Sequence, residues 1–60
     1  MRLIPLPEVM SRVQLSRATI YRFMKTGTFP LPRKLGASSR WVEEEIDVYV
    51  RDLPVAKLAA

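Results

Sequence analysis

Basic side chains are the groups in this sequence whose positions point to a chemistry. Residues 1–42 hold eight of them against one acid, Glu8, a local charge of +7, whereas residues 43–60 hold two basic side chains against five acids, a charge of −3. Arginine can donate two hydrogen bonds to guanine in the DNA major groove, and lysine or arginine neutralises phosphates. A basic body followed by an acidic segment therefore predicts a face that binds a polyanion and another face turned away from it.

Carboxylates are the second group that could do chemistry, as metal ligands or as general acids and bases. Glu43, Glu44, Glu45 and Asp47 lie close together in sequence, but on a helix only Glu43 and Asp47 share a face. The chain has no histidine, no cysteine and no glycine-rich phosphate-binding loop. We therefore expect a solvated helix start, no catalytic residue, no metal, no cofactor and no small-molecule ligand, and a protein that is not an enzyme.

Sixty residues make one domain at most, with a core that supplies roughly 3–5 kcal/mol. Neither disulfides nor a zinc site can reinforce it, so the fold must depend on packing, self-association or a stabilising ligand. The longest uncharged run has seven residues, 26–32, far fewer than the ~20 that a membrane span needs. We expect a cytoplasmic protein without a membrane partner.

Two short helices are expected to position the first basic group. Pro7 and the apolar spacing that follows predict a helix over 7–13, and Ser16 is a suitable N-cap for a second helix over 16–26 that Gly27 ends. On the second helix Ile20, Phe23 and Met24 form the buried stripe. Ala18, Arg22 and Lys25 point away from that stripe, with Tyr21 on one flank.

A hairpin and a third helix are expected to complete the domain. Residues 29–32 form an extended arm that lays Phe29 and Leu31 on the core, because two prolines exclude a helix. Strands at 33–35 and 40–42 flank a turn over 36–39, which includes Ser38 and Ser39, and Trp41 is expected in the core. The third helix begins at Glu43 and ends at Pro54, with a buried face listed as Val42, Ile46, Tyr49, Val50 and Leu53. Residues 1–53 are then the domain and residues 54–60 a flexible C-terminal tail.

This arrangement is mostly α with a small β-hairpin and predicts a winged helix-turn-helix, in which the second helix enters the DNA major groove. The predicted contacts of the recognition helix are Ser16, Arg17, Ala18, Thr19, Tyr21, Arg22 and Lys25. Those of the wing are Arg33, Lys34, Ser38, Ser39 and Arg40. Arg17, Ala18 and Arg22 are the candidates for base edges. The candidates for the DNA backbone are Tyr21, Lys25, Arg33, Lys34, Ser39 and Arg40. Tyr21 is equally compatible with packing at the rim, and the basic residues could be ordinary solvated charges.

Several motifs resemble the AlpA family of small phage regulatory proteins, which is related to excisionases and to MerR-like winged domains. They are Leu6-Pro7-Glu8-Val9, Leu15-Ser16-Arg17-Ala18-Thr19-Ile20-Tyr21-Arg22, Gly27-Thr28-Phe29-Pro30, Lys34-Leu35-Gly36 and Arg40-Trp41. The resemblance covers residues 3–53 and implies a DNA binder encoded by a prophage or genomic island. The family often has glycine before Leu-Ser, where this chain has Gln14. Because glutamine enters the left-handed conformation only at a cost, a longer turn is expected here.

Three functions remain open, the first two of them implied by the resemblance, for a bacterial protein that lies on the nucleoid when bound to DNA. The first is a transcriptional regulator, with an integrase promoter as its target, and the second is an excisionase that bends attachment-site DNA. The third is an interaction module whose acidic third helix binds an integrase or an RNA polymerase subunit. A module this small covers few base pairs, so self-association on DNA is expected.

Overall fold

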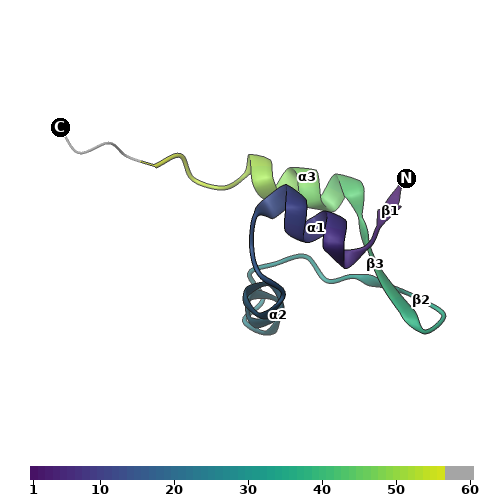
Figure 1. The fold of residues 1–60 in the computed structure, drawn as a ribbon. Helices are drawn as coiled ribbons and strands as arrows, with labels where there is room; N and C mark the ends of the chain where they lie inside the picture. Colours follow the sequence, from purple (N-terminus) through teal and green to yellow (C-terminus); the bar gives the residue numbers. More distant parts are fainter. Residues whose placement is uncertain (57–60) are drawn as a thin grey trace.

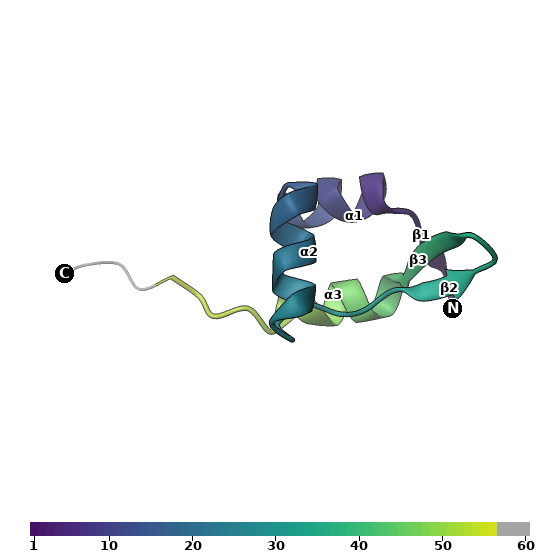
Figure 2. The same cartoon turned by 90° about the horizontal axis from the view of Figure 1, so that it is seen from below.

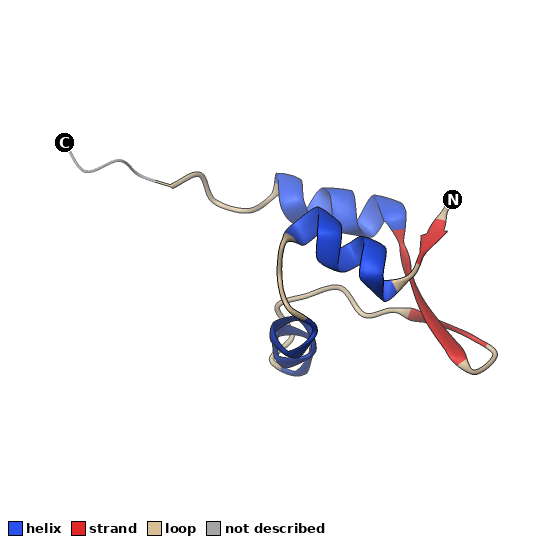
Figure 3. Ribbon diagram, viewed as in Figure 1, coloured by secondary structure: helices blue, strands red, loops and turns tan. Residues whose placement is uncertain are grey.

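The computed structural model describes residues 1–56 and contains three helices and three short strands (Figures 1 and 3). In chain order these are β1 (Leu3–Ile4), α1 (Leu6–Val13), α2 (Arg17–Lys25), β2 (Arg33–Leu35), β3 (Ser38–Val42) and α3 (Glu43–Arg51). The architecture confirms the predicted fold class: a mostly helical domain with a small antiparallel sheet, consistent with a winged helix-turn-helix.

A tight turn joins α1 to α2. Gln14 ends α1 in the left-handed conformation, with φ 57° and ψ 40°, and its backbone N–H donates to the Met10 carbonyl at 2.8 Å. Its side-chain amide donates to the Ser11 carbonyl, which helps to hold this conformation. Only Gln14, Leu15 and Ser16 separate the helices. The expectation of a lengthened turn is therefore wrong, because glutamine occupies the left-handed position itself.

The ends of α2 follow the sequence prediction. The Ser16 hydroxyl accepts a hydrogen bond from the Thr19 backbone N–H at 3.2 Å, which makes Ser16 the N-cap. Gly27 follows the helix with φ 79°, a conformation that glycine adopts without steric cost. These two residues fix the length of the helix that carries the first basic group.

The sheet has the strand order β1-β3-β2, with both pairings antiparallel. Strand β1 was not predicted, since its two residues show no periodicity and their partners, Val42 and Trp41, lie far away in sequence. The β2–β3 hairpin closes through Gly36 and Ala37 alone, with positive φ only at Gly36, the pattern of a type II′ turn. The expectation that Ser38 and Ser39 are turn residues is therefore wrong: both lie in β3.

The core lies where α1, α2, α3 and the sheet meet. Its buried residues are Ile4, Val9, Ile20, Phe29, Trp41 and Ile46. Trp41 is fully buried and its indole N–H donates to the Pro30 carbonyl at 3.0 Å, which confirms it as a core residue. The Phe29 and Tyr49 rings pack edge to face with their centroids 4.6 Å apart. The loop before β2 is thereby anchored to the core.

Three residues expected in the core are exposed: Leu31 at 60%, Val50 at 42% and Leu53 at 48%. Prolines at 30 and 32 favour a threefold polyproline conformation, in which residues two apart do not share a face, so Leu31 does not follow Phe29 inward. Helix α3 ends at Arg51, before Leu53, since the residue preceding Pro54 disfavours helix.

Residues 54–56 are exposed and lead away from the body of the molecule (Figure 2). The rest of the expected tail, 57–60, lies outside the described residues, so the division between domain and tail stays a prediction. Within the described part, no helix is long and apolar enough to cross a membrane.

Candidate nucleic-acid interface

The outward face of α2 carries the side chains that the sequence placed there. Ala18, Tyr21, Arg22 and Lys25 are all exposed, as is Arg17 in the first turn, whereas Ile20 is buried and Phe23 and Met24 pack against the core. Tyr21 is 46% exposed, so its ring lies at the edge of this face rather than in the core. One side of α2 thus packs against the core and the other presents two cations, Arg22 and Lys25, with Arg17 exposed at the start of the helix.

The start of α2 is held by its own hydroxyl groups. The Ser16 hydroxyl donates to the Thr19 hydroxyl at 2.9 Å and also accepts from the Thr19 N–H. Thr19 is half-buried, so it supports the cap more than it extends the outward face. The amides of Arg17 and Ala18 belong to the first helical turn, whose N–H groups have no partner within the helix. The positive end of the helix dipole therefore lies beside Arg17.

The β2–β3 hairpin divides its predicted contact residues between two faces. Lys34 is paired with Ser39, and Arg33 with Arg40. Directly paired residues share a face and neighbouring residues alternate, so Lys34 and Ser39 lie on one side and Arg33, Ser38 and Arg40 on the other. A single flat DNA surface cannot meet all five at once.

The two arginines on the face opposite Lys34, Arg33 and Arg40, already have interaction partners within the protein. Arg33 pairs with Glu45 of α3 at 2.8 Å. Half-buried Arg40 donates to the carbonyl of Ser39 at 3.0 Å. Among the three hairpin cations, Lys34 is the one whose side chain has no ion pair or hydrogen bond to the described residues. The sequence alone did not make this distinction.

Helix α2 and the hairpin project on the same side of the molecule. In Figure 1, α1 and α3 lie across the upper part, while α2, seen nearly end-on, and the tip of β2–β3 both extend below them. The 90° view in Figure 2 shows α2 and the hairpin at opposite ends of that side, joined by the segment that follows α2. Both basic elements are therefore presented on one side of the molecule.

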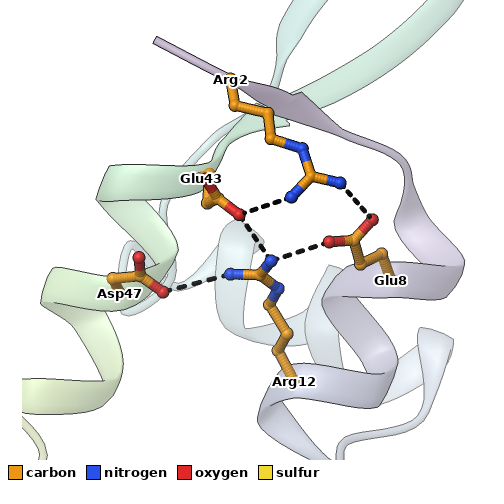
Figure 4. Close-up of polar contacts among 5 residues, drawn as sticks. All are labelled: Arg2, Glu8, Arg12, Glu43 and Asp47. Carbon is orange, nitrogen blue, oxygen red and sulfur yellow. Dashed lines mark hydrogen bonds and ion pairs between the residues drawn. The ribbon is translucent and has the colours of Figure 1, made fainter.

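A cluster of ion pairs joins the N-terminal strand, α1 and α3 (Figure 4). Arg12 of α1 binds Glu8 at 2.8 Å, Asp47 at 3.3 Å, and Glu43. Arg2 binds Glu43 at 3.0 Å and Glu8 at 3.8 Å. Glu43 and Asp47 thus share a face, as predicted, but Glu43 binds two guanidinium groups rather than only solvent.

Hydrogen bonding within the cluster shifts two titrations. The hydrogen bond from Arg12, together with the charges of Arg12 and Arg2, lowers the pKa of Glu43 below its ordinary value, although partial burial opposes this. The hydrogen bonds to Glu43 and Glu8 raise the pKa of Arg12. Glu43 is therefore an acceptor held in its ionised form. Within residues 1–56, no group of three potential ligands could hold a metal ion.

These ion pairs redistribute the basic charge that the sequence assigned to residues 1–42. Arg2, Arg12 and Arg33 are each paired with acids. Five other cations of that range form no ion pair with an acid in residues 1–56: Arg17, Arg22, Lys25, Lys34 and Arg40. The Glu8–Arg12 pair has helical i, i+4 spacing and could have been found from the sequence. The pairs from Arg2 and Arg12 to α3 span 31 to 41 residues, and no local pattern indicates them.

Comparison with known proteins identifies a family that covers most of the chain. Residues 2–52 match the family described as Prophage CP4-57 regulatory protein (AlpA). Neither a curated protein nor a solved structure matches the chain.

Proposed function

The chain belongs to the AlpA family of prophage regulatory proteins, and on that premise we propose that it regulates transcription by binding double-stranded DNA sequence-specifically. Helix α2 would enter the major groove and the β2–β3 hairpin would contact the flanking backbone as a wing. The promoter of an integrase gene is the target that we propose, which would place the protein on the bacterial nucleoid.

The observation that carries this proposal is the distribution of unpaired cations. From Gln14 to Val42 the chain has six basic side chains and no acid. Of these, only Arg33 is neutralised by an acid within the described part of the chain. The acids are collected instead around α1 and α3, on the other side of the molecule. DNA is a polyanion that such a one-sided cationic surface attracts.

Each exposed side chain has a role that its chemistry supports. Arg22, near the middle of the outward face of α2, is proposed to donate two hydrogen bonds to guanine. Arg17 and Ala18, in the first turn, are proposed to meet base edges. The backbone amides of the same turn, together with Ser16, are proposed to bind a phosphate. Tyr21 and Lys25 are proposed to contact the strand that borders the groove.

The wing contributes position rather than sequence readout. Lys34 and Ser39 share a face of the hairpin, and we propose that this face meets the DNA backbone. Arg40 lies on the opposite face, and its long side chain would have to reach past the edge of the hairpin to contact the same backbone. Arg33 would have to exchange Glu45 for a phosphate, and therefore contributes less than its charge suggests. Ser38, on the opposite face from Lys34, is then a peripheral contact at most.

The small recognition surface favours binding of several copies. Helix α2 has nine residues, a length of about 13.5 Å, and can reach only a few base pairs. Copies that contact one another on neighbouring sites would bind more tightly than a single copy. Bound DNA would in turn stabilise the folded state. The same surface would serve an excision factor, in which case the sites would flank a recombination core. In both roles we propose that the protein acts by binding and not by catalysis.

The test is recovery of a preferred site from a pool of random duplexes, followed by footprinting on prophage DNA. We expect one recurrent motif, protected near a promoter; protection beside an attachment site would instead assign the excision role. Arg22→Ala should relax the motif, whereas Lys34→Ala should weaken binding to all sequences alike. Selection that returns no motif at about 150 mM salt, or equal behaviour of the two variants, would refute the proposed docking.

A further inference from the structure

The outer face of α3 carries a shallow apolar groove that no described part of the chain covers. The groove is lined by Pro30, Glu44, Glu45 and Val48 and has a volume of about 420 Å³. Val48 is 41% exposed and lies on the side of α3 opposite the buried Ile46. Pro30 and Val48 make an apolar floor, and the two glutamates stand beside it.

The two glutamates differ in their partners. Glu45 pairs with Arg33 at 2.8 Å, whereas Glu44 forms no ion pair within residues 1–56. An apolar floor next to an uncompensated carboxylate favours a segment that offers an apolar side chain and then a cation.

The segment that follows α3 has this composition. Residues 53–58 are Leu-Pro-Val-Ala-Lys-Leu, with Lys57 as their one charge. Val55 is 91% exposed, and the chain leads away from the body at this point (Figure 1). We propose that the segment 53–58 of one copy docks in the α3 groove of a second copy, with Val55 on Pro30 and Val48 and with Lys57 at Glu44.

The spacing of the two partners agrees. In an extended segment Val55 and Lys57 share a face and are about 6.6 Å apart. Glu44 precedes Val48 by one helical turn, about 6 Å along α3. A segment that runs antiparallel to α3 therefore brings the apolar pair and the charged pair together at once.

The chain's own segment does not make this contact. Leu53 is held in the turn that ends α3, because its N–H donates to the Val50 carbonyl at 3.2 Å. Residues 54–56 then lead away from the body of the molecule (Figure 2), and Val55 is 91% exposed. The groove of each copy is therefore open to the segment of another copy.

Because the groove and the segment are different surfaces, each copy offers one of each. Such a head-to-tail contact builds a ring where the rotation between copies closes and an open array where it does not. It would be weak between free copies and stronger between copies held on adjacent DNA sites. The contact is between proteins and needs no DNA, so it can fail or hold independently of the proposed DNA binding.

The test is sedimentation of the full chain without DNA over a range of concentrations. We expect the average mass to rise above that of the monomer as the concentration increases. Val48→Asp and Val55→Asp should each weaken this association by about tenfold, the value of one buried valine side chain. Val50→Asp is the matched control, because Val50 is 42% exposed on the same helix but does not line the groove; it should associate like the parent chain.

A mixing experiment separates this geometry from other forms of association. The Val48→Asp chain keeps its segment and the Val55→Asp chain keeps its groove, so a mixture should form heterodimers that neither forms alone. Glu44→Lys should weaken the contact and Glu44→Lys with Lys57→Glu should restore it. A monomer at every concentration overturns the proposal, as does association that survives both aspartate substitutions in variants whose circular dichroism shows them folded.

Discussion

Replacing Lys34 by alanine tests whether the hairpin contacts phosphates. Lys34 lies on the hairpin face that it shares with Ser39 and forms no ion pair within the described residues. Arg51 is the matched control, since it is an exposed cation on α3, outside the proposed interface. Each substitution to alanine removes one positive charge from the chain, so only the position of that charge differs.

The structure sets the expected size of the effect. Of the five cations without an ion pair, Arg17 and Arg22 are assigned to base readout, which leaves Lys25, Lys34 and Arg40 for phosphates. Three contacts give a slope of log K against log salt of about −2.7, so a threefold rise in salt weakens binding about 20-fold. With Lys34→Ala the slope becomes about −1.8, and the same rise in salt weakens binding about 7-fold.

Fluorescence anisotropy with a labelled duplex, measured at several salt concentrations, gives both slopes directly. Arg51→Ala should keep the parent slope. Equal loss of slope in Lys34→Ala and Arg51→Ala would show that overall charge, and not the hairpin surface, drives binding. A slope close to zero for the parent chain would refute the interface altogether.

Three further predictions concern the fold. The pKa of Glu43 is lowered in the folded state, so its stabilising effect is present above the ordinary value of 4.5 and is lost as the pH falls through the lower folded value. Between these two values the melting temperature of the parent chain should fall more steeply with decreasing pH than that of Glu43→Gln. Parallel curves would contradict the role of Arg12. Trp41→Phe leaves the Pro30 carbonyl without its indole donor and loses buried volume, which lowers the free energy of unfolding by about 2 kcal/mol. The melting temperature should therefore fall by about 10 °C. An unchanged melting temperature would refute the anchoring of the loop. Gln14→Gly relieves a left-handed conformation that costs about 1–2 kcal/mol, but it also increases the conformational entropy of the unfolded chain. The free energy of unfolding should rise by about 0.5 kcal/mol, and the melting temperature by about 3 °C. Gln14→Ala should instead lower the melting temperature.

Local features of the fold could be predicted from the sequence because local physics determines them. The Ser16 cap, the Gly27 stop and the buried stripe of α2 depend only on residues within one or two helical turns. The same holds for the outward orientation of Arg22 and Lys25. The candidate surface on α2 therefore follows from periodicity alone.

Features that depend on distant partners could not be predicted in this way. Strand β1 exists because Leu3 and Ile4 find Val42 and Trp41 across the domain. The exposure of Leu31 depends on how the prolines direct the chain after Phe29 has been buried. Likewise, the pairing of Arg33 with Glu45 requires the hairpin and α3 to be in place.

The ion-pair cluster links these two levels, because it determines which charges face outward. Exposed ion pairs add little net stability, as their attraction is screened by solvent and opposed by the ordering of long side chains. The cluster therefore matters less for the free energy of unfolding than for the distribution of charge. By binding Arg2 and Arg12, the acids Glu8, Glu43 and Asp47 remove two cations from the side of the molecule that bears α1 and α3. Without those acids the chain would present positive charge on both sides, and a polyanion would be attracted in several orientations. With them, most of the uncompensated positive charge of residues 1–56 lies on α2 and the hairpin, so that electrostatic attraction would orient the face that we propose to read the DNA sequence.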